Sequence, residues 1–183
     1  MKNLLPEIGP DLGVLLSLFP RAEDVVDGMV IPAEQMPHPF QELLVHEKHM
    51  TLTMESFHHG PVDVRILERQ REGSLYARRI LLVLRRSGQM VLYGLVRIDL
   101  RLCSPQVQTE ILLGWKPLGR ILIEHNVMRR IEPTAFLRVT PGPTLVSRFA
   151  LPSAVPLFGR LAFIHCNEQP AIELLEILPP ASG

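Results

Sequence analysis

Several features are scarce in this sequence, and each shortage narrows the kind of protein it can encode. The 183 residues include only two cysteines, Cys103 and Cys166, and their spacing matches no zinc motif. We therefore expect reduced thiols in a cytoplasmic protein. Formal net charge is zero and no block of Lys or Arg concentrates charge, which argues against a nucleic-acid-binding surface. No apolar run is long enough to span a bilayer, so we expect no membrane partner.

Motifs for metal, nucleotide and nucleophilic chemistry are also missing. The sequence has no phosphate-binding glycine loop, and its serines and cysteines lack the flanking pattern of a nucleophile. The stretch His46-Glu47-Lys48-His49 is one residue short of the H-E-x-x-H zinc helix, so its two histidines would not share a helical face. We expect no metal site.

Hydrophobic residues make up 46% of the chain, which is enough to form the core of a single domain. We expect that domain to span residues 1–183. Alternation predicts strands over 49–57, 62–68, 75–86, 89–100, 127–139, 158–166 and 171–178, and short helices over 11–19, 41–48, 104–113 and 116–122. Residues 20–32 are expected to form a loop. Because hairpin turns such as Ser87-Gly88 join most neighbouring strands, we expect an α+β fold: a single antiparallel β-sheet with short helices covering one face.

Arg78 is the most informative single residue. In a strand, Tyr76, Arg78, Ile80 and Leu82 share one face, and that face is otherwise apolar. A buried guanidinium needs a partner. Arg78 therefore either pairs with a glutamate, reaches solvent at a strand end, or holds a ligand carboxylate in a bidentate grip. Arg79 falls on the other face and is expected to be solvated.

The stretch from Lys116 to Leu122 predicts a turn that runs directly into a helix. Pro117 suits the first helical turn, and Gly119 leaves the backbone amides uncovered. Free N–H groups at a helix start favour a carboxylate or a phosphate. An ordinary capped core helix is the alternative interpretation.

Two acidic residues, Glu173 and Glu176, lie in the last predicted strand among aliphatic neighbours. They fall on opposite faces, and alternation does not decide which one points inward. An inward glutamate would have its pKa raised, as a general acid requires. The alternative role is a structural partner for an arginine.

Short segments from Met36 to Ser182, taken in order, make the chain similar to the chorismate lyase-like family. They include Met36 with Phe40, Tyr76-Ala77-Arg78-Arg79-Ile80, Pro117-Leu118-Gly119-Arg120, Gly159-Arg160, and Glu176 with Pro180-Ala181-Ser182. The Pro-Leu-Gly-Arg turn and the Arg-containing strand carry most of the resemblance.

The resemblance implies a chorismate lyase-like sheet with the ligand enclosed beneath helical flaps. It implies that Arg78 binds a carboxylate, that the backbone at Leu118 and Gly119 contacts the ligand, and that Met36 closes the site. A glutamate in the last strand would be the remaining polar contact. That residue is Glu176 if a one-residue bulge near 171–175 shifts the register, with Glu173 as the second candidate.

The implied activity is that of chorismate pyruvate-lyase, a cofactor-independent carbon-oxygen lyase that converts chorismate to 4-hydroxybenzoate and pyruvate, for instance in ubiquinone biosynthesis. Arg78 and the amides at Leu118 and Gly119 would hold the carboxylates, with Glu176 as proton donor or hydroxyl partner. The resemblance also implies a monomer. The competing interpretation is a non-catalytic protein on the same fold that binds an aromatic carboxylate.

Overall fold

The computed structural model describes residues 9–181, and Ser182 of the resemblance lies outside this range. The helices are α1 (Leu12–Ser17), α2 (Phe40–Leu44), α3 (Met50–Phe57), α4 (Pro105–Leu113), α5 (Leu118–Glu124) and α6 (Pro143–Arg148), with 3-10 turns η1 (Ala33–Gln35) and η2 (Leu100–Leu102). The strands are β1 (Val25–Ile31), β2 (Val62–Glu72), β3 (Leu75–Leu84), β4 (Met90–Asp99), β5 (Arg129–Pro141), β6 (Leu157–Cys166) and β7 (Gln169–Leu178).

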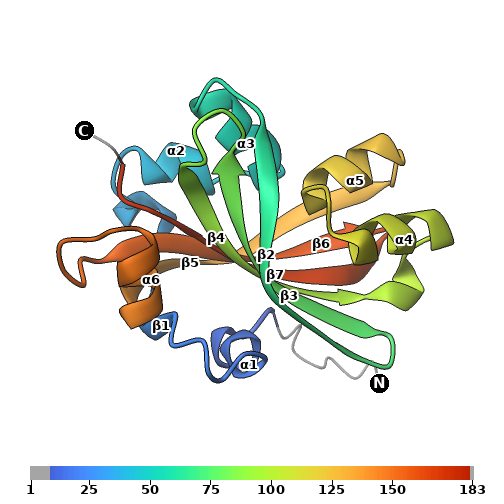
Figure 1. Cartoon of the computed structure of the whole chain (residues 1–183), viewed down its shortest axis with the longest axis horizontal. Coiled ribbons are helices and arrows are strands. Elements are labelled where there is room, and N and C mark those ends of the chain that lie inside the picture. Colours follow the sequence, from blue (N-terminus) through green and yellow to red (C-terminus); the bar gives the residue numbers. More distant parts are fainter. Residues whose placement is uncertain (1–8, 182–183) are drawn as a thin grey trace, which may run out of the picture.

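All seven strands form one antiparallel sheet in the order β1-β5-β6-β7-β4-β3-β2 (Figure 1). The expected α+β class with a single antiparallel sheet is confirmed. The β6–β7 and β3–β4 hairpins lie side by side through the β7–β4 pair. This arrangement places four strands from distant parts of the sequence next to one another at the centre of the sheet.

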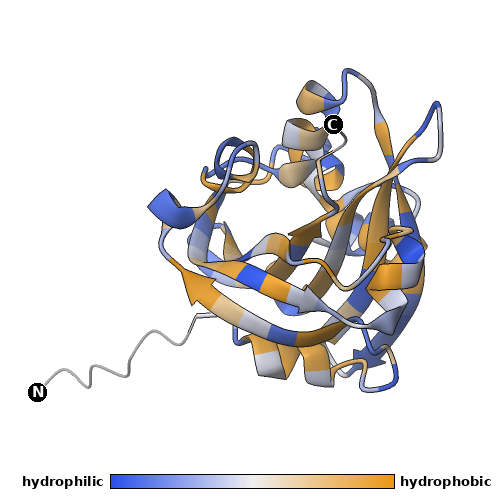
Figure 2. Ribbon diagram, turned by 90° about the vertical axis from the view of Figure 1, so that its left-hand side faces the viewer, coloured by the Kyte–Doolittle hydropathy of each residue, from blue (hydrophilic) through white to orange (hydrophobic). Residues whose placement is uncertain are grey.

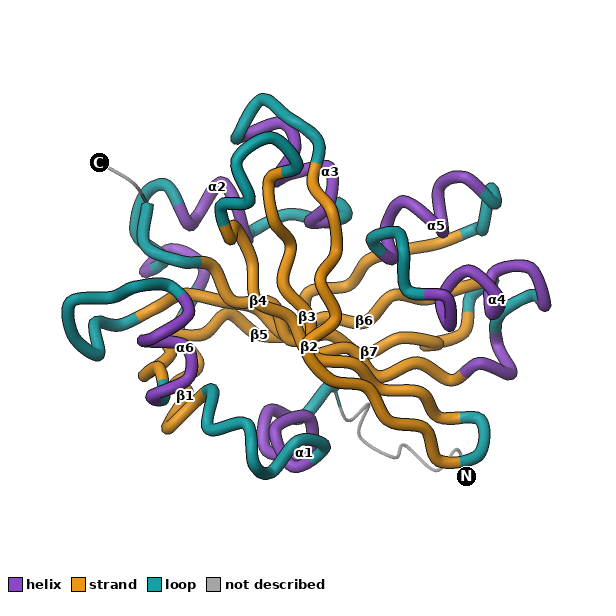
Figure 3. Tube along the Cα trace, in the orientation of Figure 1, coloured by secondary structure: helices purple, strands orange, loops and turns teal. Residues whose placement is uncertain are grey.

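The sheet packs a hydrophobic core on each face. Helices α2, α3, α4 and α5 cover the face that carries Ile80, Leu82 and Val96. Helices α1 and α6 pack on the opposite face, against Leu81, Tyr93 and neighbouring strand residues. Of the four helices expected over one face, three (α2, α4 and α5) lie there, whereas the first, α1, lies on the opposite face with α6 (Figure 3). The fourth helix on the first face is α3, which was expected to be a strand. Hydrophobic residues run along the strands between these layers (Figure 2).

Local signals in the sequence fix several element boundaries. The Asp11 carboxylate accepts the Val14 N–H at 2.9 Å and caps α1, and Ser104 caps α4 with Pro105 in the first turn. The β6–β7 turn uses positive φ at Asn167 and Glu168, as a tight hairpin requires. Both cysteines are free thiols packed in or against one core cluster, as expected.

Two local predictions were wrong, and one helix was not predicted. Residues 49–57, predicted as a strand, contain helix α3 (Met50–Phe57) preceded by its N-cap, His49. Met50, Thr51 and Met54 bury one helical face, and the alternating threonines hid this helical pattern in the sequence. Residues 25–31, expected as loop, form the edge strand β1. No element was predicted over residues 143–148, which form helix α6. This helix can begin with Pro143 because proline is tolerated in the first helical turn.

Arg79 is buried, and its predicted exposure to solvent was wrong. Its Nη1 donates to both carboxylate oxygens of Asp24, at 3.0 and 2.9 Å, and the Tyr93 hydroxyl donates to the same carboxylate. Burial and the Asp24 charge raise the pKa of Tyr93, so the phenol stays a hydrogen-bond donor. This cluster fastens the segment before β1 to the face of the sheet under α1.

Candidate functional site

A pocket lies between the face of the sheet that carries Ile80 and the helices α3 and α5 that cover it. Its atom-free space, including the opening to solvent, is about 540 Å³. Most of its wall is aliphatic, and the polar side chains are those of His49, Thr51, Arg78, Arg160 and Glu176. A mostly apolar cleft with a few converging polar groups is the usual form of a small-molecule site.

The sheet register explains why these side chains converge. Arg160, Glu176, Gly94 and Ile80 are successive cross-strand partners on β6, β7, β4 and β3, and Arg78 stands two residues from Ile80 on the same face. From strand spacing and rise, the Cα atoms of Arg78 and Glu176 lie roughly 12 Å apart. Gly94 has no side chain between them, which leaves the floor open.

Arg78 is 1% exposed, and its Nε and Nη1 atoms have no hydrogen-bond partner among the described residues. The Tyr76 hydroxyl, two residues away, is likewise buried without a partner. Burial lowers the pKa of the Arg78 guanidinium, and the nearby Tyr76 offsets part of that shift. An arginine remains charged under such conditions, so the pocket contains an uncompensated buried cation.

Glu176 points into the same pocket, and its carboxylate is held from one side. Arg160 Nε donates to Glu176 Oε2 at 2.7 Å, and both residues are buried. The register shift that brings Glu176 to this face occurs at Ala171, which β6 skips between the pairs with Pro170 and Ile172. The predicted bulge thus lies at the first residue of its expected range.

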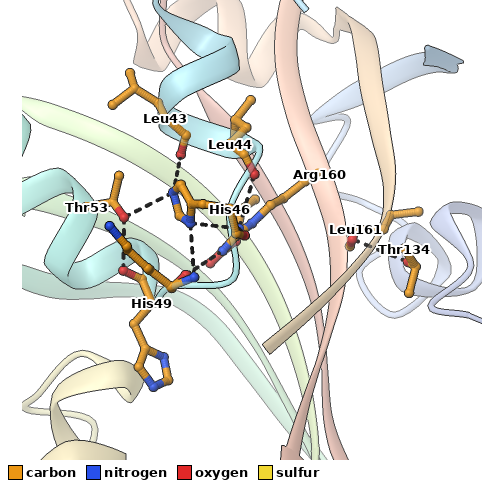
Figure 4. A network of polar contacts seen from close by, with 10 residues as sticks. Leu43, Leu44, His46, His49, Thr53, Thr134, Arg160 and Leu161 are labelled. Carbon is orange, nitrogen blue, oxygen red and sulfur yellow. Dashed lines mark hydrogen bonds and ion pairs between the residues drawn. The ribbon is translucent and has the colours of Figure 1, made fainter. Parts of the chain in front are cut away.

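Arg160 also fastens the connection between α2 and α3 over the pocket (Figure 4). Its guanidinium donates to the carbonyl oxygens of Leu44, His46 and Lys48 at 3.2, 2.8 and 3.1 Å. Together with Glu176, these acceptors engage all three of its nitrogens. Arg160 therefore couples the covering segment to the carboxylate in the pocket wall.

His49 lies at the start of α3 and lines the pocket. A neighbouring arginine determines which ring nitrogen of His49 carries the proton. Arg129 Nε donates to His49 Nε2 at 2.8 Å, so the ring carries its proton on Nδ1. Burial, with the charges of Arg129 and Arg160, lowers the pKa of His49 to about 4. The imidazole is neutral near pH 7.

The first turn of α5 closes the other side of the pocket. Leu118 and Gly119 both line it, and within the described chain no hydrogen bond uses either backbone N–H. A Cβ at Gly119 would come within 2.9 Å of Thr51 Oγ1 and 3.1 Å of His49. Glycine is therefore what lets α5 approach the start of α3.

The structure brings together Arg78, Leu118, Gly119 and Glu176, four of the six residues proposed from the sequence. Their ligand-binding role stays a prediction. Glu173 does not join them: it lies on the opposite face, where its carboxylate pairs with Arg97. The alternation that brings Glu176 into the pocket turns Glu173 away, so the position of Glu173 does not support the ligand contact proposed for it.

Met36 is buried, but in the hydrophobic cluster under α2 and α3, and it does not line the pocket. Its proposed role in closing the site is therefore not supported by its position. The covering segment is instead the α2–α3 connection that Arg160 holds. Met36 was selected because it belongs to the segments that match the family in order along the chain. That order does not show which residues of this region lie over the sheet.

Sequence reasoning missed Arg160 and His49 as pocket residues. Arg160 carried a usable signal, because it interrupts the apolar face of β6 in the same way that Arg78 interrupts that of β3. His49 carried none, because its segment was interpreted as a strand. In the part of the chain that the structure describes, no group of three or more His, Cys, Asp or Glu residues could hold a metal ion.

Comparisons with known proteins give a likeness at the level of fold. No family model matches the chain, and no curated protein matches its sequence. Among solved structures, PhnF from Mycobacterium smegmatis superposes with a TM-score of 0.51 at 8% identity, over 74% of this chain and 65% of PhnF. This likeness supports the fold alone. No helix among residues 9–181 combines the length and hydropathy needed to cross a membrane.

Two further structures match less closely. One is described as the ligand-binding domain of a GntR-family transcriptional regulator from Bordetella bronchiseptica, with a TM-score of 0.49 at 14% identity over 64% of this chain and 85% of that one. The other, a possible transcriptional regulator YydK from Bacillus subtilis, has a TM-score of 0.43 at 10% identity over 64% of this chain and 58% of its own.

Proposed function

We propose that this protein binds a small aromatic carboxylate in the pocket between α3, α5 and the sheet. The observation that carries the proposal is the Arg78 guanidinium, 1% exposed and with two nitrogens unpartnered among the described residues. Leaving buried donors unsatisfied costs about 1–3 kcal/mol each, more for a charged group. A ligand carboxylate would remove that cost by accepting from Arg78, which is the charge-assisted geometry that arginine favours.

The rest of the pocket fits the remainder of such a ligand. Aliphatic side chains such as Ile80, Val96 and Leu174 suit one aromatic ring. Glu176 Oε2 is occupied by Arg160, and the other oxygen can accept from a ring hydroxyl. The pocket therefore suits a ring with a carboxylate at one end and a hydroxyl at the other, as in 4-hydroxybenzoate.

A second candidate function is the chorismate lyase reaction, favoured by the presence of Glu176 on the same face as Arg78. In that reaction the ether bond between the ring and the enolpyruvyl oxygen of chorismate breaks, and the ring carbon that bears the hydroxyl loses its proton, so the ring becomes aromatic as 4-hydroxybenzoate. The enolpyruvyl group takes up a proton at its methylene carbon and leaves as pyruvate. Arg78 would hold a carboxylate, and a substrate that fills the pocket would displace water from it. Because Arg160 already donates to Glu176, the carboxylate is placed to accept from the ring hydroxyl.

Two measurements on the purified protein test these proposals. Isothermal titration compares 4-hydroxybenzoate with the neutral 4-hydroxybenzamide, and incubation with chorismate is followed by an enzymatic assay for pyruvate. Binding of the acid and weak binding of the amide support the carboxylate site. Pyruvate release adds the lyase, whereas binding without release leaves a binding protein. Equal affinity for acid and amide would refute the role of Arg78.

A further inference from the structure

The two edge strands of the sheet have opposite character. Strand β2 has the sequence VDVRILERQRE, with six charged residues, and this is how sheet edges are normally kept from pairing with other chains. Strand β1 has the sequence VVDGMVI, with one charged residue and no lysine or proline. It pairs only with β5, and its other edge has no strand partner in residues 9–181.

Strand β1 also exposes apolar side chains. Val26 is 69% exposed, Met29 54% and Val30 66%, all within seven residues. Single exposed apolar residues are common, but their concentration on an unpaired edge marks a surface for association. We therefore infer that β1 is the interface at which two copies of this chain pair, edge to edge and antiparallel, to form a dimer with one continuous sheet.

Self-complementarity favours a second copy as the occupant. An antiparallel pair related by a twofold axis through Gly28 places Asp27 opposite Met29 of the second copy and Val26 opposite Val30. If the axis passes through Met29, Asp27 faces Ile31. Neither register brings the two aspartates together, so no like-charge pair opposes association.

The other possible sheet extension is less favourable. Pairing β1 of one copy with β2 of the next would set apolar side chains against the charged strand. That contact is also head-to-tail, so it would continue into an open chain of molecules and would not close. In the twofold β1–β1 pair, the β1 edge of each copy is paired with that of the other, so no third copy can add at these edges. It revises the monomer implied by the sequence resemblance.

The interface involves one seven-residue strand from each copy, so its area is at the small end for protein pairs and association should depend on concentration. Sedimentation velocity over a concentration series is expected to show a monomer–dimer equilibrium in the wild type. A lysine placed on the edge by Val30→Lys should weaken dimerisation by tenfold or more. Met128→Lys is the matched control, because Met128 is 60% exposed in the loop before β5.

Amide hydrogen exchange keeps the proposal testable if Val30→Lys also affects folding. In the wild type, β1 amides should become more protected as protein concentration rises, while the β2 edge amides should not change. Three results would overturn the proposal: a monomer at all concentrations, a dimer that Val30→Lys leaves intact, or β1 protection that is independent of concentration. The last would mean that a segment of the same chain covers the edge.

Discussion

Replacing Arg78 by methionine should make the protein more stable and a poorer binder at the same time. Methionine keeps the length and flexibility of the side chain but removes the charge and the two unpartnered nitrogens, Nε and Nη1. Most core substitutions destabilise, so a gain in stability here would be informative. A gain in stability is expected if Arg78 serves to bind a ligand and destabilises the ligand-free protein.

The magnitude follows from the state of the guanidinium. Each unsatisfied buried donor costs about 1–3 kcal/mol, and part of the gain is lost to the space that methionine leaves unfilled. We expect Arg78→Met to raise the free energy of unfolding of the ligand-free protein by about 1–3 kcal/mol. For a chain of this size that corresponds to a rise in Tm of roughly 3–10 °C. Affinity for 4-hydroxybenzoate should fall roughly 10–150-fold, from the loss of about 1.5–3 kcal/mol of charge-assisted hydrogen bonding.

Arg160 provides the matched control, because it is also 1% exposed and lies on the same face of the sheet. Its donors are bonded to Glu176 and to three backbone carbonyls. Arg160→Met should therefore leave the Glu176 carboxylate and those carbonyls without their partner and destabilise by about 3–5 kcal/mol.

Thermal scans with and without ligand, together with titration calorimetry, measure both effects. If Arg78→Met lowers Tm as Arg160→Met does, then Arg78 is a structural residue and the argument for a carboxylate ligand fails. If Arg78→Met raises Tm and affinity is unchanged, the guanidinium is unsatisfied but does not contact the ligand. Only a higher Tm together with a lower ligand affinity of Arg78→Met supports the proposed site.

Three further outcomes follow from other contacts. Glu176→Gln should lower affinity for 4-hydroxybenzoate about fivefold and leave that for benzoate unchanged in parallel titrations, since only the first has a hydroxyl to donate. Because burial and Arg129 lower the pKa of His49 to about 4, below its unfolded value, the free energy of unfolding should fall as pH decreases from about 6.5 towards 4, and urea titrations of His49→Gln should show less of that fall. Arg79→Met should destabilise by about 3–5 kcal/mol by orphaning Asp24, and adding Asp24→Asn should recover part of the loss in the same thermal assay.

Period-two alternation was enough to predict the faces of the long central strands. It placed Arg78 on an apolar face, and this prediction succeeded because strand geometry is local: each residue's face follows from its neighbours. Alternation did not decide between Glu173 and Glu176, and the bulge that brings Glu176 to the pocket face was expected only from the family resemblance. The edge strand β1 was missed because Asp27-Gly28 resembles a turn and its apolar residues do not alternate.

Helix α3 was missed for a different reason. Its threonines favour a strand by propensity, but the chain must cross the pocket there and bury Met50 and Met54 one turn apart. Tertiary packing overrode local preference. The same error hid His49, because its place at the start of α3 depends on helix geometry that the sequence pattern did not indicate.

The three buried arginines differ in a property that no local pattern contains. Arg79 meets Asp24, 55 residues earlier in the chain, and Arg160 meets Glu176 from the neighbouring strand. Both pairs are long-range contacts that only the folded chain creates. Arg78 is as buried as Arg160, yet its Nε and Nη1 find no acceptor among the described residues. The described chain provides a carboxylate for two buried guanidinium groups and none for the third, which faces a pocket. This difference is consistent with a site in which a ligand supplies the missing acceptor.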